Sequence, residues 1–376
     1  GYNVKDLVKG IAPDSHFGFE ECTYLLLFGS LPTKNELKEF TNMLSKYRTL
    51  PTSFVRDIIM KAPSRDMMNT LARSVLTLYS YDDRADDISL PNVLRQCLQL
   101  ISLFPLLSVY GYQVYKHYHD GASLFIHPPK EEYSTAENIL HILRADSKFT
   151  PLEAKLLDTA LILHMEHGGG NNSTFTVRVT SSTGTDTYSS IAAGIGSLKG
   201  PLHGGANIQV ADMFHHLQEN IQDWTNVDEI DTYFTRMLNK EAYNKTGLIY
   251  GIGHAVYTIS DPRAILLKEL ARDLAREKGK EREFAFLELL EERAIDVFGR
   301  VKNNGKTVSS NVDFYSGFVY EMIGLPQEIF TPLFAMARIV GWSAHRMEEL
   351  VNMDKIIRPA YRSIMPEKAY VPLEER

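Results

Sequence analysis

The pattern that most constrains the fold is a helix-start signal that recurs along the chain. In three places a serine or threonine stands three residues before a glutamate, which is the spacing of a capping box. These pairs are Thr33 and Glu36, Ser134 and Glu137, and Thr150 and Glu153. Strict alternation of apolar and polar residues, which marks a half-buried strand, is scarce throughout. We therefore expect an all-α protein with at most a short hairpin.

The length of the chain predicts more than one lobe. Its 376 residues exceed what a single hydrophobic core usually fills, so we expect two domains with a cleft between them. The most charged stretch, residues 272–306, predicts a solvated helical lobe. The net charge of −7 gives no basic field for a nucleic-acid backbone, so an anionic ligand has to be met by local arginines.

Two sequence features favour a cytoplasmic protein that does not span a membrane. Cys22 and Cys97 lie far apart without metal-ligand spacing, which fits a reducing compartment. Residues 96–115 carry no charge over a membrane-spanning length, but glutamines, serines and Pro105 interrupt them. We expect a kinked core helix at this position.

Four glycine-flanked stretches place ionisable residues inside otherwise apolar helical sequence. Each carries a histidine or an aspartate, and the third adds Arg263. Together they supply a base, two neutral hydrogen-bond donors and an anion-binding arginine, which is what making and trapping an enolate requires. The stretches are HMEHGGGNNSTF at 164–175, GPLHGGAN at 200–207, GIGHAVYTISDPRA at 251–264 and NVDFYSG at 311–317.

His203 stands in a turn just before a helix that we expect to begin at Ala206. The two glycines after it let the backbone turn sharply and leave room for a bound molecule. The N-terminus of a helix favours a neutral imidazole over a charged one. His203 is therefore predicted to donate a hydrogen bond to a forming oxyanion, and a glycine-rich turn with an incidental histidine is the alternative.

Three other patterns carry less weight. His164 and His167 have the spacing of a metal-binding pair, but no further ligand is identifiable. The adjacent His215 and His216 point in different directions on a helix and are expected at the surface. The glycines of residues 194–200 have the wrong spacing for a dinucleotide site.

Taken in order, the polar blocks resemble those of the citrate synthase family. GPLHGGAN, GHAVY followed by DPRA, NVDFYSG, and FAMARIVGW with the later RP pair resemble its blocks, and the similarity runs from GYNVKDL at residue 1 to the C-terminal arginine. The resemblance implies that Asp313 removes a proton from the methyl group of acetyl-CoA. It further implies that His203 stabilises the enol or enolate and that His254 donates to the ketone oxygen of oxaloacetate.

The resemblance also implies how the substrates are held. Arg263, Arg338 and Arg358 match the carboxylate-binding arginines of the family, and His167 matches its substrate-binding histidine. Arg358 would reach into the active site of the neighbouring subunit, so a homodimer is implied. Acetyl-CoA is a co-substrate, and neither a cofactor nor a metal is implied. Lys306 falls where the family has a lysine and is the candidate for binding the CoA phosphates.

Three positions depart from the family pattern. Gly168 follows the substrate-binding histidine where the family commonly has glutamate. Residues 258–260 are Thr, Ile and Ser where the family usually carries a lysine or arginine, a change that bears on the CoA phosphate contacts. Ser310 stands where a proline commonly precedes the NVD triplet.

The resemblance implies a two-domain, citrate synthase-like fold. We expect a large domain of residues 1–203 and 319–376, and a small mobile domain of residues 204–318, with His203 at the hinge. Oxaloacetate would bind first and draw the lobes together, which excludes water and creates the acetyl-CoA site.

The predicted reaction condenses acetyl-CoA, oxaloacetate and water to citrate and CoA. Synthesis of 2-methylcitrate from propionyl-CoA is the nearest alternative, because one methylene in an apolar pocket is worth only about 1 to 3 kcal/mol. Dual specificity, cleavage of citryl-CoA by a lyase and a catalytically silent metabolite-binding dimer are further alternatives.

Overall fold

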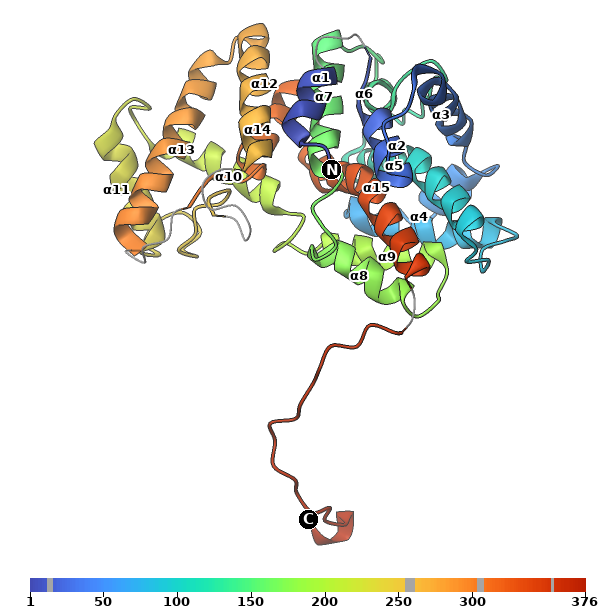
Figure 1. Ribbon diagram of the computed structural model, residues 1–376. Helices are drawn as coiled ribbons and strands as arrows, with labels where there is room; N and C mark the ends of the chain where they lie inside the picture. Colours follow the sequence, from blue (N-terminus) through green and yellow to red (C-terminus); the bar gives the residue numbers. More distant parts are fainter. Residues whose placement is uncertain (12–15, 254–260, 303–307, 353–354) are drawn as a thin grey trace.

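A computed structural model describes residues 1–11, 16–253, 261–302, 308–352 and 355–376 (Figure 1). The regular elements of these residues are helices, which confirms the all-α prediction. In place of a hairpin, the described residues contain one isolated antiparallel bridge, between Ile252 and Ser310. The α-helices are α1 (Val4–Ile11), α2 (Phe19–Phe28), α3 (Lys34–Tyr47), α4 (Met67–Leu78), α5 (Leu90–Asp120), α6 (Thr135–Leu143), α7 (Pro151–His164), α8 (Asn172–Ser181), α9 (Thr187–Leu198), α10 (Ala206–Asn220), α11 (Val227–Leu238), α12 (Pro262–Lys278), α13 (Glu281–Lys302), α14 (Asp313–Ile323) and α15 (Phe330–Val351). Short segments of other helical types are η1 (Val55–Ile59), η2 (Tyr79–Tyr81), η3 (Gln327–Ile329) and η4 (Leu373–Glu375).

All three predicted capping boxes are present. Thr33, Ser134 and Thr150 cap α3, α6 and α7, and in each case the glutamate three residues on bonds back to the backbone of the capping residue. Helix α10 begins at Ala206 as expected, so His203 lies in the turn that precedes it. Side-chain capping therefore fixes the starts of α3, α6 and α7 in the way that the sequence indicated, whereas α10 begins without a side-chain cap.

The uncharged stretch forms the middle of the core helix α5. This 31-residue helix contains Pro105. By length and composition α5 could cross a membrane, but 83% of its apolar window is buried inside the protein. Helix α5 packs against α15, and the expectation of a core helix is confirmed.

Helix α15 starts at Phe330, one residue before Thr331. Its N-terminal cap is Ile329, whose side chain cannot accept a hydrogen bond from the first turn of the helix. The Thr331 hydroxyl instead donates to the carbonyl of Gly204 (3.2 Å), next to the His203 turn. The Thr331 side chain thus joins α15 to the turn that carries His203.

A buried arginine fixes α15 against α8 and α9. Arg346 is 0% exposed and pairs with neutral groups. Its Nε donates to the Thr187 hydroxyl (3.1 Å), and Nη1 donates to the hydroxyls of Ser181 (3.0 Å) and Ser190 (2.8 Å). Nη2 donates to the carbonyl of Thr185 (2.8 Å). The guanidinium therefore sets the position of the helix that also carries Arg338.

Figure 1 shows the helices in two groups, with α10, α11, α12, α13 and α14 together on the left and the remaining labelled helices on the right. Helices α7 and α12 pack against each other across these groups. At one end of the pair Lys278 Nζ donates to Glu153 Oε1 (2.6 Å), and at the other the charge of Arg263 acts on His164. The two helices are therefore antiparallel and bring His164 and Arg263 to the same end.

Arg346→Ala is expected to lower the free energy of unfolding by about 3 kcal/mol, because it leaves three buried hydroxyl groups without their donor and opens a cavity. Chemical denaturation measures the effect. Arg56→Ala is the control, since that side chain is 72% exposed and its removal should change stability by less than about 0.5 kcal/mol. Equal effects of the two substitutions would contradict this role of Arg346.

Candidate active site

A buried cation, Arg338 on α15, lies at the centre of the candidate site. Its side chain is 1% exposed, and its guanidinium lies 4.7 Å from the centre of the Phe334 ring. Nε donates to the carbonyl of His164 (2.8 Å), and Nη1 donates to Oδ1 of Asn171 (3.1 Å). Burial lowers the pKa of Arg338 to about 10, while the charge of Glu166 opposes that shift. Arg338 is therefore positively charged at neutral pH.

A second guanidinium, that of Arg263, lies at the start of α12. Asp261 caps this helix, and Arg263 follows Pro262 in the first turn. The Asp261 carboxylate accepts from Arg263 Nε (3.1 Å) and Nη2 (2.8 Å), which orients a side chain that is 8% exposed. The charge of Arg263 lowers the pKa of Arg338. Two like charges held close together in the interior favour an anion between them.

Asp313 is the first residue of α14 and lies in the field of both arginines. Burial raises the pKa of Asp313 to about 6, while the charges of Arg263 and Arg338 lower it and that of Asp261 raises it. Its backbone N–H donates to Oδ1 of Asn311 (3.0 Å). A carboxylate with a pKa near neutrality is suited to act as a general base.

The segment before Asp313 pairs with the segment that leads to His254. The N–H of Gly253 donates to the carbonyl of Ser309 (2.8 Å), and the N–H of Asn311 donates to the carbonyl of Gly251 (2.9 Å). Ile252 and Ser310 form the bridge between these two bonds. Three predictions lie outside the described residues, namely those on His254, on Lys306 and on residues 258–260.

His203 is a neutral imidazole held by Ser173. Burial, followed by the charge of Arg338, lowers the pKa of His203 to about 4. The Ser173 N–H donates to Nε2 (3.3 Å), and the Ser173 hydroxyl lies 3.0 Å from the same nitrogen. Because Nε2 accepts, the ring proton of neutral His203 lies on Nδ1, which is left as the donor.

The histidines at the end of α7 lie beside the same arginines. His167 and both guanidinium charges act on His164, whose pKa falls to about 3, chiefly through burial. His164 is 2% exposed, and neither ring nitrogen has a hydrogen-bond partner in the described part of the chain. Within the same residues, no group of three or more His, Cys, Asp and Glu side chains has the arrangement of a metal site.

A glutamate is present near His167, but before it and not after it. The carboxylate of Glu166 accepts from the N–H of Gly168 and lies 3.1 Å from Nε2 of His345. Gly168 adopts a φ of 84°, which glycine tolerates and other residues rarely adopt. Burial raises the pKa of Glu166, but the bond to His345, the charges of His345 and Arg338 and the bond from the Gly168 N–H together outweigh burial, and the net shift is downward. The charge of Glu166 thus acts on Arg338, without a salt bridge between them, despite Gly168.

Arg358 is not brought to this cluster within one chain. It lies in the C-terminal segment, which runs away from the helices in Figure 1, and its side chain is exposed. The preceding residue is anchored, since the N–H of Ile357 donates to the hydroxyl of Ser182 at the end of α8 (3.0 Å). The predicted surface positions of His215, which pairs with Glu321, and of His216, which is partly exposed, agree with the structure.

Sequence reasoning missed several residues that complete the site, namely Ser173, Asn171, Phe334 and Glu166. Ser173 and Asn171 lie in a stretch that had been singled out for its histidines, and both look like ordinary turn residues there. Phe334 contacts Arg338 and also packs near the rings of His164 (4.9 Å between centroids) and His203 (6.2 Å). The sequence gives one indication that Phe334 belongs to the site, which is its position four residues before Arg338 on the same predicted helix.

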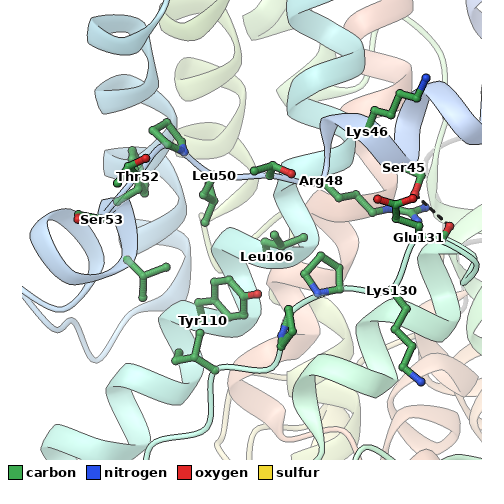
Figure 2. Close-up of a pocket in the computed structure, with 17 residues that line it drawn as sticks. Ser45, Lys46, Arg48, Leu50, Thr52, Ser53, Leu106, Tyr110, Lys130 and Glu131 are labelled. Atoms are coloured by element: carbon green, nitrogen blue, oxygen red, sulfur yellow. Dashed lines mark hydrogen bonds between the residues drawn. The ribbon is translucent and has the colours of Figure 1, made fainter.

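A cavity of about 860 Å³ ends at two predicted site residues, His167 and Arg263. Its walls come from α1, α2 and the end of α7. A different cavity, of about 630 Å³, lies between the segment after α3 and the prolines at 128 and 129. Figure 2 shows Tyr110 and Leu106 along it, and no predicted site residue lines it.

Comparison with known proteins decides the family. The family model described as "Citrate synthase, C-terminal domain" matches residues 1–360. The chain belongs to the citrate synthase family. It is 34% identical to a citrate synthase of Synechocystis sp., with 100% of this chain and 87% of the relative covered. It is 31% identical to a 2-methylcitrate synthase of Shewanella oneidensis, with 100% and 91% covered.

Solved structures of the citrate synthase family have the same fold. The chain is 30% identical to the Thermoplasma acidophilum citrate synthase, solved as a ternary complex with carboxymethyl coenzyme A and oxaloacetate, and the TM-score is 0.83 over 100% of this chain and 92% of the other. The match to the citrate synthase of Pyrobaculum aerophilum has a TM-score of 0.81 at 31% identity, with 100% and 88% covered. The predicted fold class and family are confirmed.

His203 is expected to remain neutral, with its proton on Nδ1, until the pH falls to about 4, because its pKa is lowered. Nitrogen-15 NMR of the imidazole, assigned with His203→Gln, measures both properties. Arg338→Met should raise the pKa of His203 by removing the nearby cation. Arg178→Met, on the same helix as Ser173 but paired with Glu349, should leave it unchanged. A proton on Nε2 would contradict the assignment.

Proposed function

We propose that the protein condenses acetyl-CoA with oxaloacetate and water to give citrate and CoA. Membership of the citrate synthase family supports an acyltransferase of this class. The observation that carries the proposal is the carboxylate of Asp313, whose pKa is about 6, in the field of two buried arginines that also act on a neutral histidine. A base, a neutral donor and an anion site are what an enolate condensation needs.

In the proposed mechanism, Asp313 takes a proton from the methyl group of acetyl-CoA. The N–H at Nδ1 of His203 donates to the thioester oxygen and stabilises the enol or enolate as it forms. The new carbon nucleophile attacks the ketone carbon of oxaloacetate, whose oxygen receives a hydrogen bond from His254. Water then hydrolyses citryl-CoA and releases citrate and CoA.

The arginines supply the binding of oxaloacetate in this proposal. Arg263, Arg338 and His167 hold its carboxylates from within one chain, and Arg358 reaches the site of a neighbouring subunit in a homodimer. The exposed C-terminal segment, in which Arg358 follows the anchored Ile357, supports the last assignment. Lys306 binds the CoA phosphates.

Two domains move in the proposed cycle. Residues 1–203 and 319–376 form the large one and residues 204–318 the small one, with His203 at the hinge. The two groups of helices in Figure 1 support this division, since Arg338 comes from one group and Arg263 and Asp313 come from the other. Bound oxaloacetate would draw the groups together through its contacts with both arginines.

Small-angle scattering is expected to show a smaller radius of gyration when oxaloacetate is added, because the ligand joins residues of both proposed domains. Arg263→Met should abolish the compaction, whereas Arg272→Met, on the same helix and paired with Glu288 at the surface, should retain it. An unchanged radius with saturating oxaloacetate would contradict the proposed closure.

Synthesis of 2-methylcitrate from propionyl-CoA is the second candidate. The observation that favours it is the full-length match to a 2-methylcitrate synthase, at an identity close to that of the citrate synthases. The two substrates differ by one methylene, which a pocket distinguishes by about 1 to 3 kcal/mol. Dual specificity is therefore a realistic form of the proposal.

Free thiol is expected to be released when the protein is mixed with oxaloacetate and acetyl-CoA. Comparing this rate with the rate for propionyl-CoA shows which of the two synthase activities the protein prefers. Asp313→Asn should lower kcat by about 10² to 10⁴, because it removes the general base. Oxaloacetate binding, measured by calorimetry, should remain. Asp212→Asn is the control, an exposed acid on α10. No thiol release from either substrate would favour the silent dimer, and lost oxaloacetate binding in Asp313→Asn would mean that its role is misassigned.

A further inference from the structure

A carboxylate on α13, Glu291, binds three side chains, two of which come from the segments on either side of Asp313 in the chain. Its Oε1 accepts from the hydroxyl of Ser310. Its Oε2 accepts from the hydroxyl of Tyr315 and from the ammonium of Lys268 (2.7 Å). Glu291 is 15% exposed, and Ser310 and Tyr315 are 6% and 0% exposed. We call these four residues the Glu291 cluster.

Two members of the Glu291 cluster flank Asp313 in the sequence. Ser310 comes three residues before Asp313, in the bridge to Ile252, and Tyr315 comes two residues after it, in the first turn of α14. The first turn of a helix lacks intrahelical partners for its N–H groups and is prone to fraying. One carboxylate that holds both neighbouring segments therefore fixes the backbone from which the Asp313 side chain projects.

The same cluster joins Asp313 to the helix of Arg263. Lys268 lies on α12, five residues after Arg263, and its ammonium lies 5.5 Å from the centre of the Tyr315 ring. Glu291 thus connects α12, α13 and α14 at one point. The separation between the Arg263 guanidinium and the Asp313 carboxylate depends on how these helices sit against each other.

Ser310 makes its contribution through a side-chain hydroxyl at a position where the family commonly has proline. The two hydrogen bonds of the bridge use the N–H of Gly253 and of Asn311 and the carbonyls of Ser309 and Gly251. Neither bond uses the N–H of Ser310, so a proline there would keep both. Proline restricts φ covalently, whereas the serine is restrained by its bond to Glu291.

We propose that Glu291 is a positioning residue that holds the Asp313 carboxylate in place for proton abstraction, through the hydroxyls of Ser310 and Tyr315. The inference rests on the proposed function for the role of Asp313 as the base. It adds a residue that lies 20 positions before the NVDFYSG block and on which the reaction depends.

The test compares Glu291→Gln and Ser310→Ala with Ser310→Pro. Glu291→Gln and Ser310→Ala should each lower kcat about tenfold to a hundredfold, the size of effect expected from a small misplacement, with little change in the KM for oxaloacetate. Ser310→Pro should retain activity close to that of the original protein. Glu288→Gln is the matched control, because Glu288 contacts Lys268 (3.4 Å) from the same helix without reaching Ser310 or Tyr315.

The pH profile separates positioning from loss of stability. The charges that act on Asp313 are those of Arg263 on α12, of Asp261 at the N-terminal cap of α12, and of Arg338 on α15. Burial, followed by the charge of Asp313, raises the pKa of Tyr320 on α14. The two arginines lower the pKa of Asp313, so a displaced carboxylate should titrate at a higher pH. The acid limb of kcat/KM, expected near pH 6, should therefore move upward in Glu291→Gln and remain in place in Glu288→Gln.

Hydrogen exchange of the peptide 308–320 provides a second readout that needs no substrate. Exchange should be faster in Glu291→Gln and Ser310→Ala, and unchanged in Ser310→Pro and Glu288→Gln. Equal exchange rates of this peptide in Glu291→Gln and Glu288→Gln would overturn the inference. Equal kcat values of these two variants would overturn it as well. If the original protein releases no thiol from acetyl-CoA or propionyl-CoA, the proposed function is wrong. The exchange experiment would still decide whether Glu291 holds residues 308–320.

Discussion

The candidate site depends on a positive charge kept in the protein interior by neutral acceptors. Among the described residues, Arg338 donates to a backbone carbonyl and to an asparagine oxygen, and no carboxylate lies at salt-bridge distance. Its field helps to keep His203 neutral and opposes the rise in the pKa of Asp313 that burial causes. A buried cation without a paired anion favours an anionic ligand. Binding and proton transfer are therefore linked through one side chain.

Two supports keep that charge in place, and both connect distant parts of the chain. Arg346, two turns further along α15, is held by hydroxyls of α8 and α9. Glu166 adds a negative charge that keeps the pKa of Arg338 from falling further. The glutamate that the family commonly places after the substrate-binding histidine is absent, but Glu166 reaches the backbone of Gly168 from the other side. A carboxylate therefore still contacts the loop at Gly168, but it comes from the residue before His167 and not from the residue after it.

The sequence predicted the features that local chemistry decides. The three capping boxes, the buried character of α5 and the helix start after His203 follow from contacts within a few residues. It did not predict the bond between Ser173 and His203 or the hydroxyl shell of Arg346, because these join residues that are 30 and more than 150 positions apart. Nor did it predict the bond from the Thr331 hydroxyl to the carbonyl of Gly204, which joins residues 127 positions apart.

The most direct test of the central claim is a crystal structure of the protein with oxaloacetate and carboxymethyl coenzyme A. The account predicts that the guanidiniums of Arg263 and Arg338 both contact oxaloacetate carboxylates. It also predicts that the Asp313 carboxylate and Nδ1 of His203 face the carbon and oxygen of the bound thioester analogue. Oxaloacetate bound away from Arg338, or an Asp313 carboxylate turned away from both ligands, would contradict the account.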